Sequence, residues 1–334
     1  MIKKILFELC VLALTVGTLS VNAQAQSGGC AGWWTSGWNY MLNPPPNGAF
    51  GCGVTGPWLV TCQMMNTNCA PPPGCSDCKN PKASLPINLV TGNTDINQTD
   101  VKIPGLGGGL TLVRTWNSMW PSTQTAFQVG LFGPNWRSTY EERVFVGSDN
   151  YIKYARSDGG FWSFGFSAGT YVPVAPANAT ATLVQGSNYW TLTFQNGEQR
   201  RFNYTSGSLI AIIDRNGNTT QLVYDGLNRL YTVTDPASRT LTFTYQSPSS
   251  YLVTGVSSSV GISLTYAYDA QNRLSQVTNP DLTTLTFAYD SQSRITSVTD
   301  SNGKILESHT YDNSGRGRTG SQAGGVNAIT VTYQ

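Results

Sequence analysis

The sequence predicts an all-β protein in which antiparallel β-hairpin repeats form a continuous, spiral-type sheet, preceded by a small disulfide-rich loop module. After Phe202 a tyrosine recurs every 21 to 23 residues: Tyr224, Tyr245, Tyr268, Tyr289, Tyr311 and Tyr333. A fixed period of this length indicates a repeat architecture. Charged residues make up only 11% of the 334, whereas Gly numbers 35 and Pro 17, a composition that suits strands and turns better than helices.

Residues 1–25 are interpreted as a secretory signal peptide. Lys3 and Lys4 form its positive end, residues 5–21 form the apolar run, and the small-residue motifs VNA or AQA offer a cleavage site. The run is short for a bilayer span and is interrupted by Glu8, which argues against a membrane anchor. We therefore expect a secreted or cell-surface protein with no membrane span after removal of the signal.

Residues 26–82 are rich in Cys, Pro and Trp and show no helical or strand periodicity. The six cysteines that follow the signal all lie here: Cys30, Cys52, Cys62, Cys69, Cys75 and Cys78. An even number in a short exported segment predicts disulfides, although fifteen pairings are possible. The alternative is a metal site at the CSDC motif, but no second close pair and no His lie nearby.

Four tryptophans in the same segment leave two readings open: Trp33, Trp34, Trp38 and Trp58. A small module with few aliphatic residues can use Trp for its core. The same rings could instead contact a sugar or a surface, and we keep them as possible ligand contacts.

Residues 83–200 are predicted to form a β-rich introductory domain. From about Ser84, short β-prone runs alternate with turn signals such as SDGG and QNGE, which are of the Asp-Gly and Asn-Gly hairpin type. No convincing helix is found between residues 84 and 334.

Residues 201–334 are predicted to form the repeat sheet. In four units a Tyr-Asp pair is followed by Arg four residues after the Asp: Tyr224, Asp225 and Arg229; Tyr268, Asp269 and Arg273; Tyr289, Asp290 and Arg294; Tyr311, Asp312 and Arg316. An active site is normally built once, so recurrence favours a structural ion pair that ties a turn to the next strand. In the TLTFTY strand, Leu241, Phe243 and Tyr245 fall on one face. Strict alternation fails between Leu230 and Val233, which predicts a bulge or a tight twist.

The pattern in YDGLNRLYTVTD and YDAQNRLSQVTN resembles the repeats of the RHS (rearrangement hotspot), or YD-repeat, family. The preceding stretch, including GPNWRSTYEERV and SDGGFWSFG, is similar to the β-rich region that introduces YD repeats in bacterial members. The resemblance covers roughly residues 84–334. It implies a structural role, since larger members wind such a sheet into a shell around a C-terminal toxin or form surface adhesins.

Catalytic and metal-binding motifs are not recognised in the sequence. The one histidine, His309, lies within a repeat strand, and GLGGG (105–109) lacks the βαβ context of a phosphate loop. DRNGNT (214–219) resembles a calcium loop but lacks the required Gly and the terminal Glu, so a hairpin is expected. The adjacent pair Glu141 and Glu142 would point to opposite faces of a strand, which leaves only a small chance of a carboxylate-based glycan hydrolase.

These observations predict an exported, non-enzymatic structural protein that needs no cofactor or metal. The scattered Lys and Arg of a chain with net charge +2 give no case for nucleic-acid binding. About five units cannot close a shell, so the chain is expected to be a truncated frame or a short member whose open sheet edge meets a glycan or protein partner. The alternative is a cell-surface carbohydrate-binding or adhesion module.

Overall fold

The computed structural model describes residues 87–119, 129–147, 149–176 and 178–333, together with the backbone of β1 (Leu19–Gln24), β2 (Phe50–Thr55) and β3 (Leu59–Met64). The chain divides into a large unit, residues 96–284, and a small unit, residues 1–95 with 285–334. The described residues form strands joined by turns, with the short 3-10 turns η1 (Leu106–Gly108) and η3 (Ala323–Gly325) as helical elements. The all-β prediction is confirmed. No helix in this part of the chain is long and apolar enough to cross a membrane.

The strands from β4 to β22 are β4 (Asp95–Ile103), β5 (Leu110–Asn117), β6 (Val129–Gly130), β7 (Gly133–Pro134), β8 (Trp136–Ser138), β9 (Arg143–Val146), β10 (Ile152–Ala155), β11 (Phe161–Ser167), β12 (Thr170–Ala175), β13 (Ala181–Gln185), β14 (Tyr189–Phe194), β15 (Gln199–Asn203), β16 (Leu209–Ile213), β17 (Thr219–Tyr224), β18 (Leu230–Thr234), β19 (Thr240–Tyr245), β20 (Val253–Ser258), β21 (Ser263–Tyr268) and β22 (Leu274–Thr278). The C-terminal strands are β23 (Thr284–Tyr289), β24 (Ile295–Asp300), β25 (Ile305–Tyr311), β26 (Gly317–Gln322) and β27 (Ile329–Tyr333).

In the large unit, each strand from β9 to β22 pairs antiparallel with the next one along the chain. Short hairpins connect them, as expected when sequential strands are spatial neighbours. β15 crosses the predicted domain boundary at residue 200, so the sheet passes without a break from the introductory region into the repeats.

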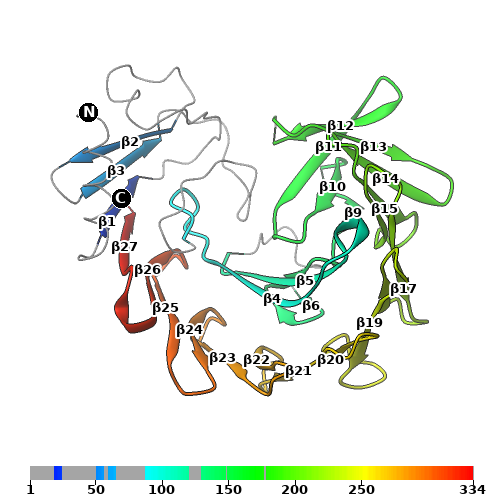
Figure 1. The fold of residues 1–334 in the computed structure, drawn as a ribbon. Helices are drawn as coiled ribbons and strands as arrows, with labels where there is room; N and C mark the ends of the chain where they lie inside the picture. The colour runs from blue at the N-terminus through cyan, green and yellow to red at the C-terminus, as the bar shows by residue number, and fades with distance from the viewer. Residues whose placement is uncertain are drawn as a thin grey trace, which may run out of the picture. The chain divides into compact units, whose positions relative to one another are not determined.

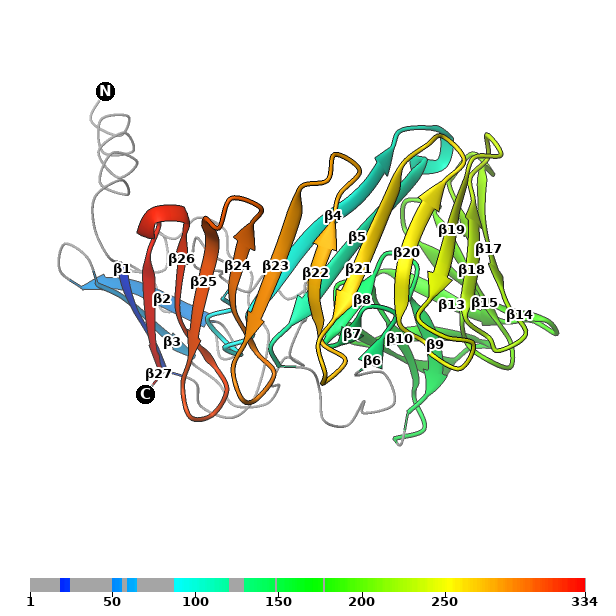
Figure 2. The same ribbon diagram turned by 90° about the horizontal axis from the view of Figure 1, so that it is seen from below.

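A separate three-stranded sheet, in the order β4-β5-β8, packs on the concave side of this curved sheet (Figure 1). Seen at right angles, β4 and β5 lie behind β20 to β22 (Figure 2). The connection between β6 and β7 reaches the repeat strands: the amide of Val253 donates to the carbonyl of Leu131 at 2.8 Å, and the rings of Phe132 and Tyr266 have centroids 4.9 Å apart. The core of the large unit lies between these two layers.

The predicted irregularity in the repeat strands is a β-bulge. Tyr224 pairs with Leu230 but Val223 pairs with Thr232, which leaves Tyr231 as the extra residue. The bulge lets Leu230 and Val233 both face the core, 2% and 0% exposed, while Tyr231 is 51% exposed. The same break in register precedes the other described repeat tyrosines, Tyr245, Tyr268, Tyr289 and Tyr311.

In the small unit, β23 to β27 form successive antiparallel hairpins. β1 pairs in parallel with β27 and with β3, and β2 pairs antiparallel with β3. β27 pairs with β1, whose residues lie in the segment predicted to be the signal peptide, so the open sheet edge expected after removal of the signal stays a prediction. The signal peptide itself stays a prediction.

The segment 26–82 is not wholly strandless as predicted, since β2 and β3 lie in it and their register places Cys52 opposite Cys62. The side chains of all six predicted disulfide cysteines lie outside the described residues. So do those of Trp33, Trp34, Trp38 and Trp58. The disulfide module and the Trp contacts therefore stay predictions.

Most of the repeat turns share one backbone conformation, with a left-handed fourth residue. Asn228, Asn272 and Ser293 hold this position with φ of 58°, 60° and 62°. At the turn that begins with Asn279, the position is taken by Leu282, with φ 67° and 80% exposure. A γ-branched side chain gains nothing there, since only Gly, Asn and Asp visit the left-handed region at little cost.

Leu282→Asn is expected to raise the free energy of unfolding by about 1 kcal/mol, because Asn tolerates the left-handed conformation that Leu adopts under strain. Urea unfolding followed by circular dichroism measures the change. The matched control is Leu227→Asn, an exposed Leu one position earlier in an equivalent turn, which should not stabilise the protein. An equal gain in both variants would show that lower surface hydrophobicity is the cause and not backbone strain.

Candidate functional site: the repeat joints

The repeated tyrosines hold neighbouring strands together through their hydroxyls. Five of the repeat tyrosines donate their hydroxyl to a backbone carbonyl 15 or 16 residues earlier: Tyr224 to Leu209 (2.8 Å), Tyr245 to Leu230 (2.6 Å), Tyr268 to Val253 (2.6 Å), Tyr311 to Ile295 (2.8 Å) and Tyr333 to Gly317 (2.9 Å). In all five cases the acceptor is the first residue of a strand, so each bond fixes where that strand begins.

The repeated aspartates close the turns. In the first joint, Asp225 Oδ1 accepts the amides of Leu227 and Arg229, each at 2.9 Å, and Oδ2 accepts Arg229 Nε at 2.7 Å. The joints that begin at Asp269, Asp290 and Asp312 repeat this arrangement. A carboxylate that accepts two backbone amides and a guanidinium makes charge-assisted hydrogen bonds on both oxygens. Neither oxygen is then well placed to act as a base or a nucleophile.

The arginines couple one repeat to the next, which the sequence analysis did not foresee. The guanidinium of Arg229 lies over the ring of Tyr245 with 4.4 Å between its carbon and the ring centroid; the same holds for Arg294 over Tyr311 (4.6 Å) and Arg316 over Tyr333 (4.2 Å). Arg229 Nη1 also donates to the carbonyls of Ser247, Pro248 and Ser250. The joints of Arg229, Arg294 and Arg316 therefore combine an ion pair within a unit with a cation–π contact to the following unit.

A further joint escaped the sequence analysis because it lacks the tyrosine. In VTDPASR, Asp235 accepts the amides of Ala237 and Arg239 and the Arg239 guanidinium, with Oδ2 to Nη2 at 2.6 Å. The signal was present, since Asp and Arg are again four residues apart. Asp300 makes the same two amide contacts, to Asn302 and Lys304.

The joints also form hydrogen bonds with residues of the introductory region. Arg239 Nη2 donates to the carbonyl of Pro104 at 2.9 Å. A Cβ at Gly105 would meet the end of the flexible Arg239 side chain, whereas a Cβ at Gly109, where φ is 66°, would overlap the backbone carbonyl of Ile103. The GLGGG stretch is therefore a close-packed turn that needs glycine at Gly109. In the same unit, the carbonyl of Leu131 accepts the hydroxyl of Tyr268 at 3.3 Å.

A buried ion pair anchors the inner sheet. Arg114 on β5 is fully buried and donates Nη2 to Asp100 Oδ1 on β4 at 2.8 Å. Its guanidinium carbon lies 4.8 Å from the ring centroid of Trp136 and 5.5 Å from that of Tyr266, whose hydroxyl donates to Asp100 at 2.7 Å. The network links both layers of the large unit through Asp100, which accepts bonds from Arg114 and Tyr266.

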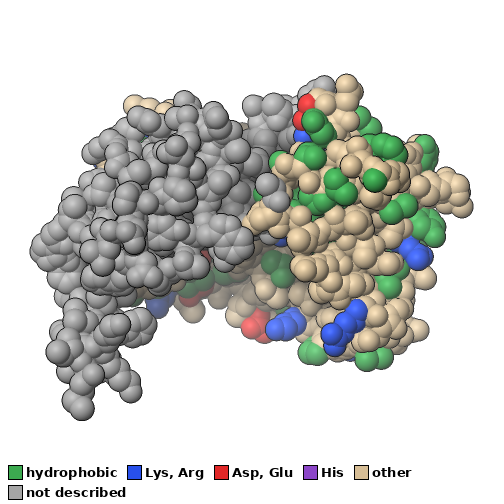
Figure 3. All heavy atoms as spheres, turned by 90° about the horizontal axis from the view of Figure 1, so that it is seen from above, with side chains coloured by type: hydrophobic (Ala, Val, Ile, Leu, Met, Phe, Trp, Pro, Cys, Tyr) green, Lys and Arg blue, Asp and Glu red, His purple; other side chains and the backbone are tan. Residues whose placement is uncertain are grey.

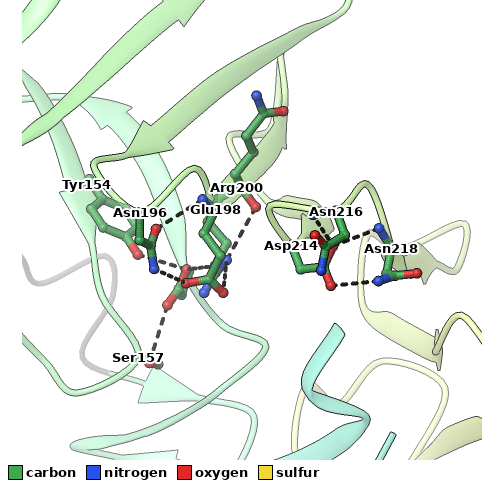
Figure 4. A network of polar contacts seen from close by, with 10 residues as sticks. Tyr154, Ser157, Asn196, Glu198, Arg200, Asp214, Asn216 and Asn218 are labelled. Carbon is green, nitrogen blue, oxygen red and sulfur yellow. Dashed lines mark hydrogen bonds and ion pairs between the residues drawn. The ribbon is translucent and has the colours of Figure 1, made fainter. Parts of the chain in front are cut away.

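The strongest candidate for chemistry is a buried glutamate network shown in part in Figure 4. Glu142 accepts the hydroxyl of Tyr154 at 2.8 Å and lies 3.3 Å from Arg200 Nε, while Glu198 lies 3.3 Å from Arg200 Nη1. Burial raises the pKa of Glu142 despite the nearby Arg200 charge. Both carboxylates are thus engaged by one guanidinium and tie the 142–143 segment to the hairpin of β14 and β15.

Glu141 points elsewhere. Its Oε1 accepts the amide of Leu131 at 2.7 Å, and burial raises its pKa against the charge of Arg137. The two glutamates precede β9 and are not on a strand as assumed, but the expectation that they diverge agrees with their different partners. They do not form a pair across one bond.

The remaining predicted sites also have structural surroundings. Asp214 Oδ1 accepts the amides of Asn216 and Asn218, and Oδ2 accepts the Asn218 side chain, so the calcium-loop-like stretch is a hairpin turn (Figure 4). His309 is buried, with Nε2 3.3 Å from Glu307. Within the described ranges no group of three or more His, Cys, Asp and Glu residues is arranged to hold a metal ion.

Comparison with known families agrees with this geometry. The model of the domain of unknown function DUF6531 matches residues 84–164, and the RHS Repeat model matches residues 204–240, 252–284 and 268–305. The chain belongs to the RHS/YD-repeat family. The RHS matches cover joints with both Tyr-Asp-Arg and Asp235–Arg239 chemistry.

Among curated proteins, the RHS chain is 31% identical over 145 residues to the tRNA nuclease WapA of Bacillus subtilis (strain 168) and to the tRNA3(Ser)-specific nuclease WapA of Bacillus spizizenii. The alignment covers 43% of this chain but only 6% of each relative. Similar solved structures include TcdB2-TccC3-Cdc42, at 10% identity and TM-score 0.32 over 68% of this chain and 14% of that chain. Another is the Photorhabdus luminescens Tc holotoxin pore, at 15% identity and TM-score 0.25 over 72% and 14%.

The cation–π link predicts energetic coupling between successive RHS units. In a double-mutant cycle of Arg294→Met with Tyr311→Leu, the coupling energy from urea unfolding should be about 0.5–2 kcal/mol, as for partly desolvated cation–π pairs. The control cycle combines Arg294→Met with Tyr333→Leu, whose ring is covered by Arg316 instead, and should give no coupling. Equal coupling in both cycles would contradict a specific stacking link.

The joint carboxylates predict acid sensitivity. Burial alone would raise the pKa of Asp269, but hydrogen bonds from the amide and side chain of Arg273 and from the amide of Gln271 outweigh it. The net effect is a lowered pKa. The pKa values of Asp225, Asp235 and Asp312 are lowered in the same way. Because the folded pKa of these four carboxylates lies below the unfolded value of about 3.9, each of the four stabilises the protein above that pH and loses this contribution as pH falls through its folded pKa.

Thermal unfolding between pH 2.5 and 6 should therefore show a steep loss of stability below about pH 4. Asp269→Asn should be less stable than the parent at pH 6, by about 1–2 kcal/mol, and should lose less on acidification. An unchanged slope in Asp269→Asn would show that other groups cause the acid sensitivity.

Proposed function

We propose that this chain is an exported structural protein without catalytic activity, a segment of an RHS-type shell or surface scaffold that encloses or presents a toxin or effector domain. The observation that carries the proposal is the use of the recurring Tyr, Asp and Arg groups. Each Asp binds two backbone amides and a guanidinium, and each Tyr hydroxyl binds a backbone carbonyl. Side chains engaged in this way rigidify a sheet and offer no free acid, base or nucleophile.

The curated relatives support the scaffold role through the proportions of the match. They are named as tRNA nucleases, yet this chain corresponds to only 6% of their length. A shared fold does not carry an activity, which depends on a specific site. We therefore assign the nuclease activity to other parts of those proteins and a scaffold role to the repeat-containing part. Export rests on the positive, apolar and small-residue regions of residues 1–25.

The scaffold role is tested with a reporter enzyme fused after Gln334 and expressed in a bacterium with the native first 25 residues. The reporter should be active outside the cell, and the scaffold part of the fusion should resist protease. Replacing Asp225, Asp269 and Asp312 together by Ala should abolish resistance, whereas replacing the exposed turn residue Asp281 should not. Equal resistance in both variants would overturn the scaffold role, and reporter retained in the cytoplasm would overturn export.

The non-enzymatic part has a separate readout. The purified chain should hydrolyse neither tRNA nor polysaccharides, and Glu142→Gln should behave as the parent. Hydrolysis by the parent that is lost in Glu142→Gln but kept in Glu307→Gln would identify the buried glutamate network as an active site and overturn this part of the proposal.

A further inference from the structure

Four Asn-Gly pairs occur in the chain, and three of them lie in described hairpin turns: Asn196-Gly197, Asn216-Gly217 and Asn302-Gly303. The fourth, Asn47-Gly48, lies outside the described residues. In an Asn-Gly pair the backbone nitrogen of the Gly can approach the Asn side chain closely, because Gly has no Cβ to hinder it. These pairs are therefore candidate sites of spontaneous chemical modification.

The three turns share one backbone conformation. In each turn the Gly is left-handed, with φ of 84° for Gly197, 86° for Gly217 and 77° for Gly303. The amide of each Gly donates to the carbonyl three residues earlier, at 2.9, 3.0 and 3.0 Å. Freeing this amide costs a similar hydrogen bond in all three turns, so differences in reactivity are expected to come from the surrounding side chains.

The side chain of Asn196 is held at both ends. Its Oδ1 accepts the amide of Glu198 at 3.0 Å, and its Nδ2 donates to the Glu198 carboxylate at 3.2 Å (Figure 4). A Cβ at Gly197 would meet the Arg215 side chain at 3.3 Å, so this turn is also packed against its neighbour. These contacts keep the side-chain Cγ of Asn196 from turning toward the Gly197 nitrogen.

Asn216 and Asn302 have exposed side chains whose amide groups bond to no other described residue. Their backbone amides donate to the carboxylates of Asp214 and Asp300, at 2.8 and 2.9 Å, which leaves the side chains free to rotate (Figure 4). A Cβ on the following Gly would meet no atom within 4 Å in either turn. Both turns therefore have the room to rearrange that the Asn196 turn lacks.

We propose that Asn216 and Asn302 are sites of spontaneous deamidation and that Asn196 is protected from it. The backbone nitrogen of the Gly attacks the Asn side-chain Cγ, and the new N–Cγ bond closes a succinimide ring. The Cγ–Nδ2 bond breaks, and Nδ2 leaves as ammonia with the proton of the Gly nitrogen. Water then opens the ring at either of its carbonyls, which gives aspartate or isoaspartate.

Each product adds a carboxylate to a turn that already holds one. The new charge lies two residues from Asp214 or Asp300, whose Oδ1 accepts two backbone amides of the same turn. Isoaspartate also inserts a methylene into the main chain between those two amides, so they can no longer both reach the carboxylate in this geometry. Charged side chains are few on the described part of the face in Figure 3, which makes an added carboxylate a large local change.

The test incubates the purified full chain at mildly alkaline pH, where the Gly nitrogen loses its proton more readily, and follows each site by peptide mapping and mass spectrometry. Asn216 and Asn302 should convert about 10-fold faster than Asn196, because two side-chain hydrogen bonds must break before Asn196 can react. In urea the three sites should react at similar rates. Glu198→Ala should raise the rate at Asn196 alone, since it removes the acceptor of the Asn196 Nδ2.

Four results would overturn the proposal: no conversion at Asn216 or Asn302, equal rates at the three sites of the folded chain, the same order of rates in urea, or an unchanged rate at Asn196 in Glu198→Ala. The third result would assign the difference to the flanking sequence and not to the fold. Asn216→Gln combined with Asn302→Gln should abolish the acidic forms that ion exchange detects after incubation and the accompanying fall in melting temperature. Asn196→Gln is the matched control and should age as the parent does.

Discussion

The carboxylate of each joint aspartate is the interaction on which the repeat sheet depends. A five-residue turn with a left-handed fourth position leaves two backbone amides pointing inward, and Asp225 Oδ1 accepts both. The second oxygen holds Arg229, and this ion pair orients the guanidinium for the next ring. Removing the carboxylate would thus release a turn, an ion pair and a contact between units together. The Asp side chain is short enough to accept the amides of its own turn, and its charge adds the bond to Arg.

The introductory segment uses these joints as docking points. Pro104 and Leu131 each supply a backbone carbonyl to a joint residue, and the Asp100–Arg114–Tyr266 network fixes the sheet between them. Hairpins alone expose an apolar face that must be covered by a second layer. In the large unit, β4, β5 and β8 are that layer. Within the large unit, the repeats up to β22 and the region before them therefore share one core, although their sequences look unrelated.

Much of the fold could be predicted from the sequence because the information is local and repeated. The repeat period, the turn residues and the spacing of Leu230 and Val233 can all be seen within one or two units of sequence. The bulge follows from that spacing. The contacts that were missed join positions far apart. Arg229 reaches Tyr245 in another unit, Arg239 reaches Pro104, and Ser208 returns to Arg143. Asp235 does not fit the Tyr-Asp pattern because no Tyr precedes it, although its four-residue spacing to Arg239 gives the same ion pair.

The forward reach of each arginine gives the sheet a direction. Arg229 lies over the ring of Tyr245, which comes later in the chain, whereas the hydroxyl of Tyr245 donates to the carbonyl of Leu230, which comes earlier. The arginine of one unit therefore gains its cation–π partner only when the next unit has folded. The tyrosine of that next unit binds a carbonyl of a hairpin that is already formed. A chain that emerges amino end first, from a ribosome or through a membrane, can add hairpins singly in this order. In this order of folding, the hydroxyl of each added tyrosine stabilises the hairpin that precedes it.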